Sequence, residues 1–120
     1  MLTAGKALKV CIYLSEGSRR HGAASEASIL DFLLHHGVAG ASVFKGVAGF
    51  GVDHHLHSAS FVELSDHLPV KIEFIETPEK VDELMDKLTE LAGSGMIDVQ
   101  ETMIVKPPME PKRSDVKRAS

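Results

Sequence analysis

The sequence predicts an α+β fold, a ferredoxin-like βαββαβ sandwich in which two helices cover one face of an antiparallel sheet. Strand-like segments, in which apolar and polar residues alternate, are interleaved with two segments of helical apolar spacing. The order along the chain is strand, helix, strand, loop, strand, helix, strand, which divides into two βαβ halves of similar length. The 120 residues, 43% of them hydrophobic, suffice for one domain with a single core.

The first strand is predicted over residues 7–14, and the first helix begins with Ser25 as its N-cap. Alternate apolar side chains of the strand face the core: Leu8, Val10, Ile12 and Leu14. The helix ends in the region of Gly37, a residue type that favours helix C-termini.

The apolar residues of this helix lie on two faces. The buried stripe is predicted to comprise Ala27, Leu30, Leu33 and Leu34. Ile29 and Phe32 widen it to a second face, which we expect to pack against another subunit or a sheet edge. His35 and His36 lie in the last turn, where the helix dipole favours them without any metal.

The stretch over residues 40–51 is the most informative part of the chain. Alternating residues up to Val47 predict a strand, and Gly46, Gly49 and Gly51 crowd its end. Glycines in such positions indicate either backbone with positive φ or the close approach of another group. We therefore expect a ligand site where this strand meets the loop that follows.

The second half begins with a strand or strand extension over residues 59–64. Pro69 is expected to break it, because proline cannot donate a hydrogen bond to a sheet ladder, and another strand follows over residues 70–75. The domain is predicted to comprise residues 1–106, and residues 107–120 form a flexible tail containing Pro, Lys and Arg.

The second helix has clear end signals. Thr77 is the predicted N-cap, Pro78 occupies the first helical position and Gly93 ends the helix. Its buried stripe consists of Val81, Leu84, Met85, Leu88, Leu91 and Ala92. A last strand is predicted over residues 96–105.

The composition argues against several classes of partner and location. A net charge of −4, no tryptophan and one tyrosine argue against nucleic-acid binding. The single cysteine, Cys11, has no partner for an intramolecular disulfide, which favours the cytoplasm, and it is expected to pack rather than to react. No apolar run approaches the roughly 18 residues of a membrane span, so direct membrane insertion is not expected.

No catalytic motif stands out, and the chain is not expected to be an enzyme. It contains no nucleophile elbow, no phosphate loop ending in Gly-Lys-Ser/Thr and no isolated pair of carboxylates in an apolar setting. A small enzyme that uses the open face of the sheet, as the dimeric α+β barrels do, is the least supported alternative.

A histidine cluster provides a metal-binding alternative. His54, His55 and His57 follow Asp53, and one strand would present His55 and His57 on the same side. Neutral imidazoles suit zinc, copper or nickel, and further ligands could come from a neighbouring subunit. This alternative is a metal-binding trimer similar to the CutA-type proteins.

One face of the predicted sheet has no helix to cover it. It carries Tyr13 and Ile75 with their neighbours, and an apolar face of this kind favours self-association. We therefore expect a homo-oligomer.

Three segments resemble the PII signal-transduction superfamily. They are Lys45-Gly-Val-Ala-Gly-Phe-Gly51, Leu68-Pro-Val-Lys-Ile-Glu73 and the helix from Pro78. The sequence is most similar to a group of small PII-like proteins, classed as a domain of unknown function, that carry Gly-Val-Ala-Gly-Phe-Gly. The resemblance extends over residues 8–105.

The resemblance implies a trimer that binds a small ligand, such as an adenine nucleotide, in clefts between subunits. The segment over residues 52–68 would correspond to a short T-loop that reports to a protein target, which in the family is a transporter, channel or enzyme. The positions that match the family's binding site are Ser42, Gly46, Gly49, Phe50, Gly51, Gly93, Ser94 and Gly95. Backbone N–H groups in such glycine turns can form a concavity for anions.

The sequence departs from the family's pattern where the family contacts phosphates. Val52 and Asp53 replace an Arg-Gln pair, and Met96 and Ile97 follow Gly95 without the family's lysine. The segment over residues 52–68 contains no tyrosine to be uridylylated. These departures argue against a triphosphate held in the family's manner and leave a less charged nucleotide or another small metabolite.

Overall fold

The computed structural model describes residues 2–15, 26–50, 57–58 and 68–109. Its elements are β1 (Gly5–Ser15), α1 (Glu26–His35), β2 (Ala41–Lys45), β3 (Ala48–Gly49), β4 (His57–Ser58), β5 (Pro69–Glu76), α2 (Pro78–Ala92) and β6 (Met96–Ile104).

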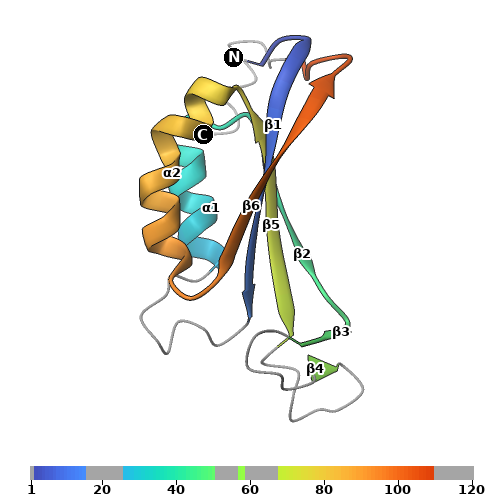
Figure 1. Ribbon diagram of the computed structural model, residues 1–120, viewed down its shortest axis with the longest axis vertical. Helices are drawn as coiled ribbons and strands as arrows, with labels where there is room; N and C mark the ends of the chain where they lie inside the picture. Colours follow the sequence, from blue (N-terminus) through green and yellow to red (C-terminus); the bar gives the residue numbers. More distant parts are fainter. Residues whose placement is uncertain (1, 16–25, 51–56, 59–67, 110–120) are drawn as a thin grey trace, which may run out of the picture.

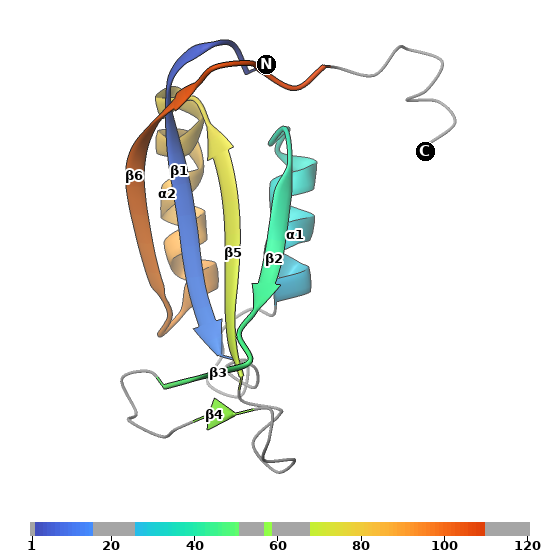
Figure 2. The ribbon, with the colours of Figure 1, turned by 90° about the vertical axis from the view of Figure 1, so that its right-hand side faces the viewer.

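The main sheet has the strand order β2-β5-β1-β6, and all neighbouring strands are antiparallel. Both helices lie on the same face of this sheet, and the other face is open (Figures 1 and 2). Because β5 lies between β1 and β2, the first βαβ unit is split by a strand from the second half. The predicted ferredoxin-like α+β fold is confirmed.

The core lies between the sheet and the two helices. In β5 every second residue is buried, as the predicted alternation requires. The largest fully buried side chains come from β1, α1, β5 and α2: Val10, Ile12, Ile29, Leu33, Val70, Ile72, Leu84 and Leu88. All of them belong to a single hydrophobic cluster.

The second helix forms as its sequence predicts. The Thr77 hydroxyl accepts a hydrogen bond from the backbone N–H of Lys80 at 3.2 Å, and Pro78 occupies the first turn. Gly93 caps the other end with φ 57°. One stripe, including Val81 and Ala92, faces the core, and the opposite side is strongly charged.

The predicted buried stripe of the first helix is wrong in part. Ile29 and Leu33 are its buried centre, whereas Ala27 is exposed and Leu34 is 73% exposed. In a helix, Ile29 and Leu33 lie one turn apart on one side, and Ala27 and Leu34 point about 120–140° away from them. Ile29 and Phe32 were expected to pack against another subunit or a sheet edge, and the structure packs both of them against the core of their own chain.

A buried carboxylate joins the ends of the two helices. Glu76 is 3% exposed, and its two oxygens accept hydrogen bonds from the backbone N–H groups of Ala39 and Thr77, at 2.8 and 3.2 Å. The Lys80 ammonium donates to the carbonyl oxygen of His36 at 2.9 Å. The turn after α1 and the start of α2 are thereby held together, and the burial of Glu76 is satisfied by these bonds.

The strand predicted up to Val47 ends earlier. β2 stops at Lys45, and after Gly46 the backbone forms the short strand β3, which pairs with β4 as a separate two-stranded ladder. The predicted strand over residues 59–64 lies outside the described residues, as does Ser25. No helix within the described ranges is long and apolar enough to cross a bilayer.

Candidate functional site

Two glycine-containing turns lie at the same end of the main sheet. The first glycine turn, residues 46–50, directly follows β2, and the second glycine turn, residues 93–95, joins α2 to β6. β2 and β6 are the two edge strands, separated by β5 and β1 (Figure 2). With strands about 4.8 Å apart, these edges are separated by about 14 Å within one chain.

The first glycine turn is shaped by Pro69. The backbone N–H of Gly46 donates to the carbonyl oxygen of Pro69 at 2.8 Å. A Cβ atom placed on Gly46 would lie 2.6 Å from Pro69 Cγ, and one placed on Gly49 would lie 3.2 Å from the same atom. Neither glycine has a positive φ. Of the two explanations expected from the sequence, close approach of another group is therefore the correct one here.

Beyond Gly46 the backbone pairs with β4, with Ala48 opposite Ser58 and Gly49 opposite His57. Val47 is 78% and Phe50 is 68% exposed. Apolar side chains therefore reach solvent at the edge of the sheet where a ligand was expected. Gly51, the third glycine of the motif, lies outside the described residues.

The second glycine turn needs glycine for different reasons. Gly93 has φ 57°, and its N–H donates to the carbonyl oxygen of Glu90 at 3.2 Å. The N–H of Gly95 donates to Ala92 at 2.8 Å, and a Cβ atom on Gly95 would collide with the carbonyl oxygen of Tyr13. Ser94 is exposed between the two glycines.

The N–H groups of Gly46, Gly93 and Gly95 all donate within the chain. These three groups are therefore not available to form the anion-binding concavity expected from the sequence.

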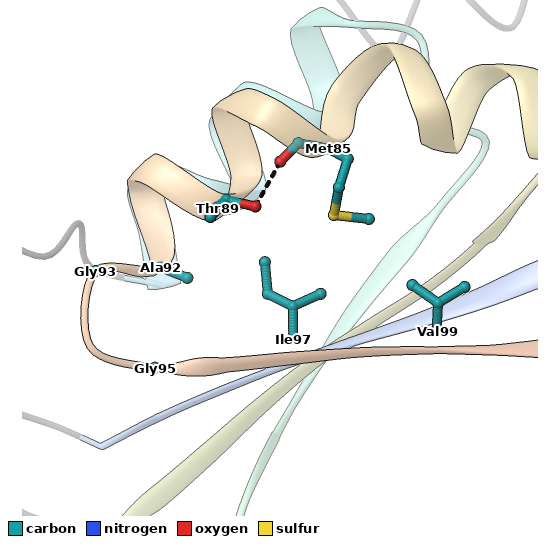
Figure 3. A pocket seen from close by; sticks show the side chains of 7 residues that line it. All are labelled: Met85, Thr89, Ala92, Gly93, Gly95, Ile97 and Val99. Atoms are coloured by element: carbon teal, nitrogen blue, oxygen red, sulfur yellow. Dashed lines mark hydrogen bonds between the residues drawn. The ribbon is translucent and has the colours of Figure 1, made fainter.

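A shallow pocket of about 350 Å³ adjoins the second glycine turn (Figure 3). Its lining is mainly apolar: Met85, Thr89, Ala92, Gly93, Gly95, Ile97 and Val99. The only side-chain hydroxyl, that of Thr89, already donates to the carbonyl oxygen of Met85 at 2.9 Å. The pocket thus suits the uncharged part of a ligand better than a phosphate.

Ser42 lies apart from both turns. It is exposed in the middle of β2 and pairs with Glu73 of β5, on the open face of the sheet. The structure therefore brings Gly46, Gly49 and Phe50 together in one turn and places Ser42 further along the same edge.

The histidine cluster was predicted as a metal-binding alternative. His54 and His55 lie outside the described residues, and of His57 only the backbone is described. Within the described ranges no three His, Cys, Asp or Glu side chains form a group that could hold a metal ion. His35 and His36 instead place Nδ1 2.8 Å from the helix carbonyl oxygens of Asp31 and Phe32.

The open face of the sheet carries a polar network rather than a uniformly apolar surface. The Cys11 thiol donates to a Glu73 carboxylate oxygen at 3.7 Å, and Lys71 lies 3.4 Å from the same oxygen. Lys71 also lies 5.0 Å from the centre of the Phe44 ring. Burial, reinforced by the negative charges of Glu73 and Asp98, raises the pKa of the Cys11 thiol. Cys11 is therefore a poor nucleophile, as expected from the sequence.

Most of the chain, from β1 to β6, matches a known family. Residues 7–104 match the model of DUF190, described as "Uncharacterized ACR, COG1993". The chain belongs to the DUF190 family. A DUF190-type relative, the UPF0166 protein MJ1524 of Methanocaldococcus jannaschii, is 32% identical over 102 residues, which cover 84% of this chain and 94% of the relative. A UPF0166 protein of Aquifex aeolicus is 26% identical over 96 residues, covering 78% and 89%.

Solved structures that resemble this DUF190 chain include those of a PII-like protein. CPII from Thiomonas intermedia K12, a nitrogen regulatory PII-like protein bound to ADP, AMP and bicarbonate, superposes with a TM-score of 0.66 at 19% identity, covering 89% of this chain and 95% of CPII. Its apo form gives a TM-score of 0.59 at 20% identity, covering 88% and 98%. The predicted resemblance is confirmed in two respects: the chain belongs to a family classed as a domain of unknown function, and it shares the fold of PII-like proteins.

Sequence reasoning missed two residues that shape this region. Pro69 was interpreted only as a strand break, although it begins β5 and contacts both described glycines of the first turn. Glu76 was not singled out, although its position after three alternating buried residues of β5 places it on the core side. A charged residue at a predicted core position was the available signal for Glu76.

Proposed function

We propose that the protein is a cytoplasmic homotrimer that binds an adenine nucleotide in three equivalent clefts and regulates a partner protein without catalysis. Each cleft would be formed by the first glycine turn of one copy and the second glycine turn of the next. The segment over residues 52–68 would respond to the ligand and contact the partner, a transporter, channel or enzyme.

The observation that carries this proposal is the position of the two turns. They lie at the same end of the sheet but on opposite edges, so one chain alone cannot bring them around a small ligand. Head-to-tail association of β2 of one copy with β6 of the next would place them side by side. Such a heterologous contact forms a closed ring when the rotation between copies closes, and the proposed ring contains three copies.

Both edges have surfaces suited to association. Among the described strands, β2 and β6 each pair with a single neighbour, which leaves backbone groups available along the outer side. Phe44 on β2 is 49% exposed, and Met96 and Val99 on β6 are also exposed. Covering these side chains would remove apolar surface from water on both strands of each contact, β2 of one copy and β6 of the next.

The chemistry of the pocket favours recognition of the base or ribose over recognition of phosphate. Its lining is apolar, and the neighbouring glycine N–H groups are already bonded within the chain. A nucleotide with few phosphates suits this site better than a triphosphate. CPII, which shares the fold, has been solved with ADP and AMP, and these are the natural first probes.

The segment over residues 52–68 leaves and re-enters the domain at one place. It follows the first glycine turn along the chain, and it is followed by Pro69, whose carbonyl oxygen accepts a hydrogen bond from that turn. A ligand at the first glycine turn would therefore act close to both ends of the segment. This arrangement supports a regulatory role in which ligand binding changes the population of segment conformations.

Two measurements test the proposal. Sedimentation velocity should give a species of about 39 kDa, corresponding to three chains of 13.0 kDa. Isothermal titration with AMP, ADP and ATP should show saturable binding for at least AMP or ADP. A monomer would exclude the clefts, and a trimer that binds none of the three nucleotides would exclude the nucleotide.

A charged substitution separates the subunit contact from general effects of charge. Val99→Glu places a carboxylate on the β6 edge beside the pocket and should both dissociate the trimer and abolish binding. Lys87→Glu also adds negative charge, but on the exposed side of α2, and should change neither property. Equal behaviour of the two variants would contradict the proposed contact.

A further inference from the structure

We propose that Pro69 is the positioning residue of the candidate ligand site. It would hold the first glycine turn in the conformation that faces the neighbouring copy, and it would do so by packing rather than by touching the ligand. The effect on ligand binding rests on the proposed function, whereas the packing itself does not.

Pro69 fixes the turn from two sides. Its carbonyl oxygen accepts the hydrogen bond from Gly46 at 2.8 Å, which sets the direction in which the chain leaves β2. Its ring fills the space where a side chain at residue 46 or 49 would lie, with Cγ 2.6 and 3.2 Å from the two Cβ positions. A side chain at residue 46 would therefore force the turn or Pro69 to move, and one at residue 49 would require only a small adjustment.

Pro69 itself is held in place. It is the first residue of β5 and pairs with Ser15 at the end of β1, and the next residue, Val70, is 2% exposed in the core. The proline ring also restricts its own φ. The contact is therefore anchored on the main sheet, and the turn adapts to it rather than the reverse.

The backbone angles make this interpretation testable. Since neither Gly46 nor Gly49 has a positive φ, the backbone itself would accept an alanine at either position. An alanine there would even restrict the unfolded chain and stabilise the fold slightly. The ring of Pro69 is what forbids it, so the effect of Gly46→Ala should change sign when Pro69 is replaced.

The experiment is a double-mutant cycle on the full chain with Gly46→Ala, Pro69→Ala and the double variant, at one fixed protein concentration. Gly46→Ala alone should lower Tm by about 5–15 °C, because its Cβ overlaps Pro69 Cγ. In the Pro69→Ala protein, which lacks Cγ, the same substitution should leave Tm unchanged or raise it. A matched control is Pro78→Ala at the start of α2. In this background Gly46→Ala should lower Tm by the same amount as in the unmodified protein.

Titration with ADP provides the second readout. Gly46→Ala should weaken ADP binding at least tenfold, and the double variant should bind within about threefold of Pro69→Ala. If Gly46→Ala lowers Tm equally in both backgrounds, or not at all, the packing role is excluded. If Tm follows the cycle while ADP affinity is the same in all four proteins, the positioning role is excluded.

A substitute variant and an independent readout keep these outcomes distinct. If Gly46→Ala does not fold, Gly49→Ala replaces it, since its milder 3.2 Å contact with the same Pro69 atom should produce the same reversal on a smaller scale. If the unmodified protein binds neither ADP nor AMP, the nucleotide proposal fails, and the Tm cycle still decides whether Pro69 fixes the turn.

Discussion

The two glycine turns lie at one end of the sheet, but different physical constraints require their glycines. In the first turn, Gly46 and Gly49 have ordinary backbone angles and are constrained by the ring of Pro69. In the second turn, Gly93 has a positive φ, and Gly95 lies against the main-chain carbonyl of Tyr13.

A side chain can be exchanged by a single substitution, and a main-chain carbonyl cannot. The first turn can therefore be reshaped without altering the fold, whereas the second turn is part of the fold. Glycine content by itself is thus not evidence of a ligand, because packing and backbone conformation within the chain explain the described glycines in both turns. The evidence for a site is that the two turns lie at the same end of the sheet and that a pocket adjoins the second turn.

Gly95→Ala should have the largest effect of any substitution in the two turns. Its Cβ would collide with the carbonyl oxygen of Tyr13 and lie 2.8 Å from Leu14 Cδ2. Because the backbone of β1 cannot move away without breaking its pairing, the free energy of unfolding should fall by about 3 kcal/mol or more. Urea unfolding measures this loss, and Ser94→Ala, at an exposed neighbouring position, should stay within about 0.5 kcal/mol of the unmodified protein.

Gly93→Ala should have an intermediate effect. Here the obstacle is the backbone conformation, φ 57° and ψ −119°, which a residue with a Cβ adopts only under strain. Such strain costs about 1–3 kcal/mol, to be measured by the same urea unfolding. Unlike Gly46→Ala, this loss should persist in the Pro69→Ala protein. A loss that disappears there would mean that both turns are governed by one contact.

Gly49→Ala should cost least among the glycines, about 1 kcal/mol or below, because a shift of a few tenths of an ångström relieves its contact with Pro69 Cγ. Amide hydrogen exchange is the suitable measurement, since it detects local opening of β3 and β4 without global unfolding. Faster exchange confined to these two strands would agree with a local adjustment. Uniform acceleration across the main sheet would not.

β1, one of the two strands between the edges that carry the turns, should make stability sensitive to alkali. Burial raises the pKa of the Cys11 thiol above its ordinary value of 9.0, so the folded protein keeps this proton where the unfolded chain has lost it. Stability is therefore retained below pH 9 and falls as the pH rises further, with a slope of at most about 1.4 kcal/mol per pH unit for one proton. Burial raises the pKa of Tyr13 as well, in the same sense.

Cys11→Ala separates the two contributions. Urea unfolding between pH 8 and 10 should show a shallower decline of stability for this variant, because the Cys11 thiol no longer contributes to it. An identical decline in both proteins would show that Cys11 does not cause the effect.

The fold could be predicted because its signals are local. In α2, the cap at Thr77, the proline at residue 78 and a single apolar stripe fix the ends and the buried face within one segment. In α1 apolar residues occupy almost every direction, so the sequence does not define the inward face. Packing against the sheet determines that Ile29 and Leu33 are the buried residues, and this tertiary contact cannot be inferred from the helix sequence alone.

The candidate site could be predicted only in outline. The glycines at residues 46 and 49 were visible in the sequence, but their reason was not, because Pro69 reaches them from another strand. The N–H groups of Gly46, Gly93 and Gly95 could not be judged from the sequence for a similar reason, since the fold determines which carbonyl oxygens accept their hydrogen bonds. The site residues as a group, and the histidines at residues 54 and 55, stay predictions.

The strand order also has a consequence for biosynthesis. β1 pairs only with β5 and β6, and in the main sheet β2 pairs only with β5, so neither described strand of the first half has a sheet partner until the second half is made. While the chain emerges from the ribosome, β1 must wait for β5, its first partner in the sheet, to be made. Until then the backbone groups of β1 have no strand of their own chain to pair with, and an unpaired strand of this kind can pair with a neighbouring chain.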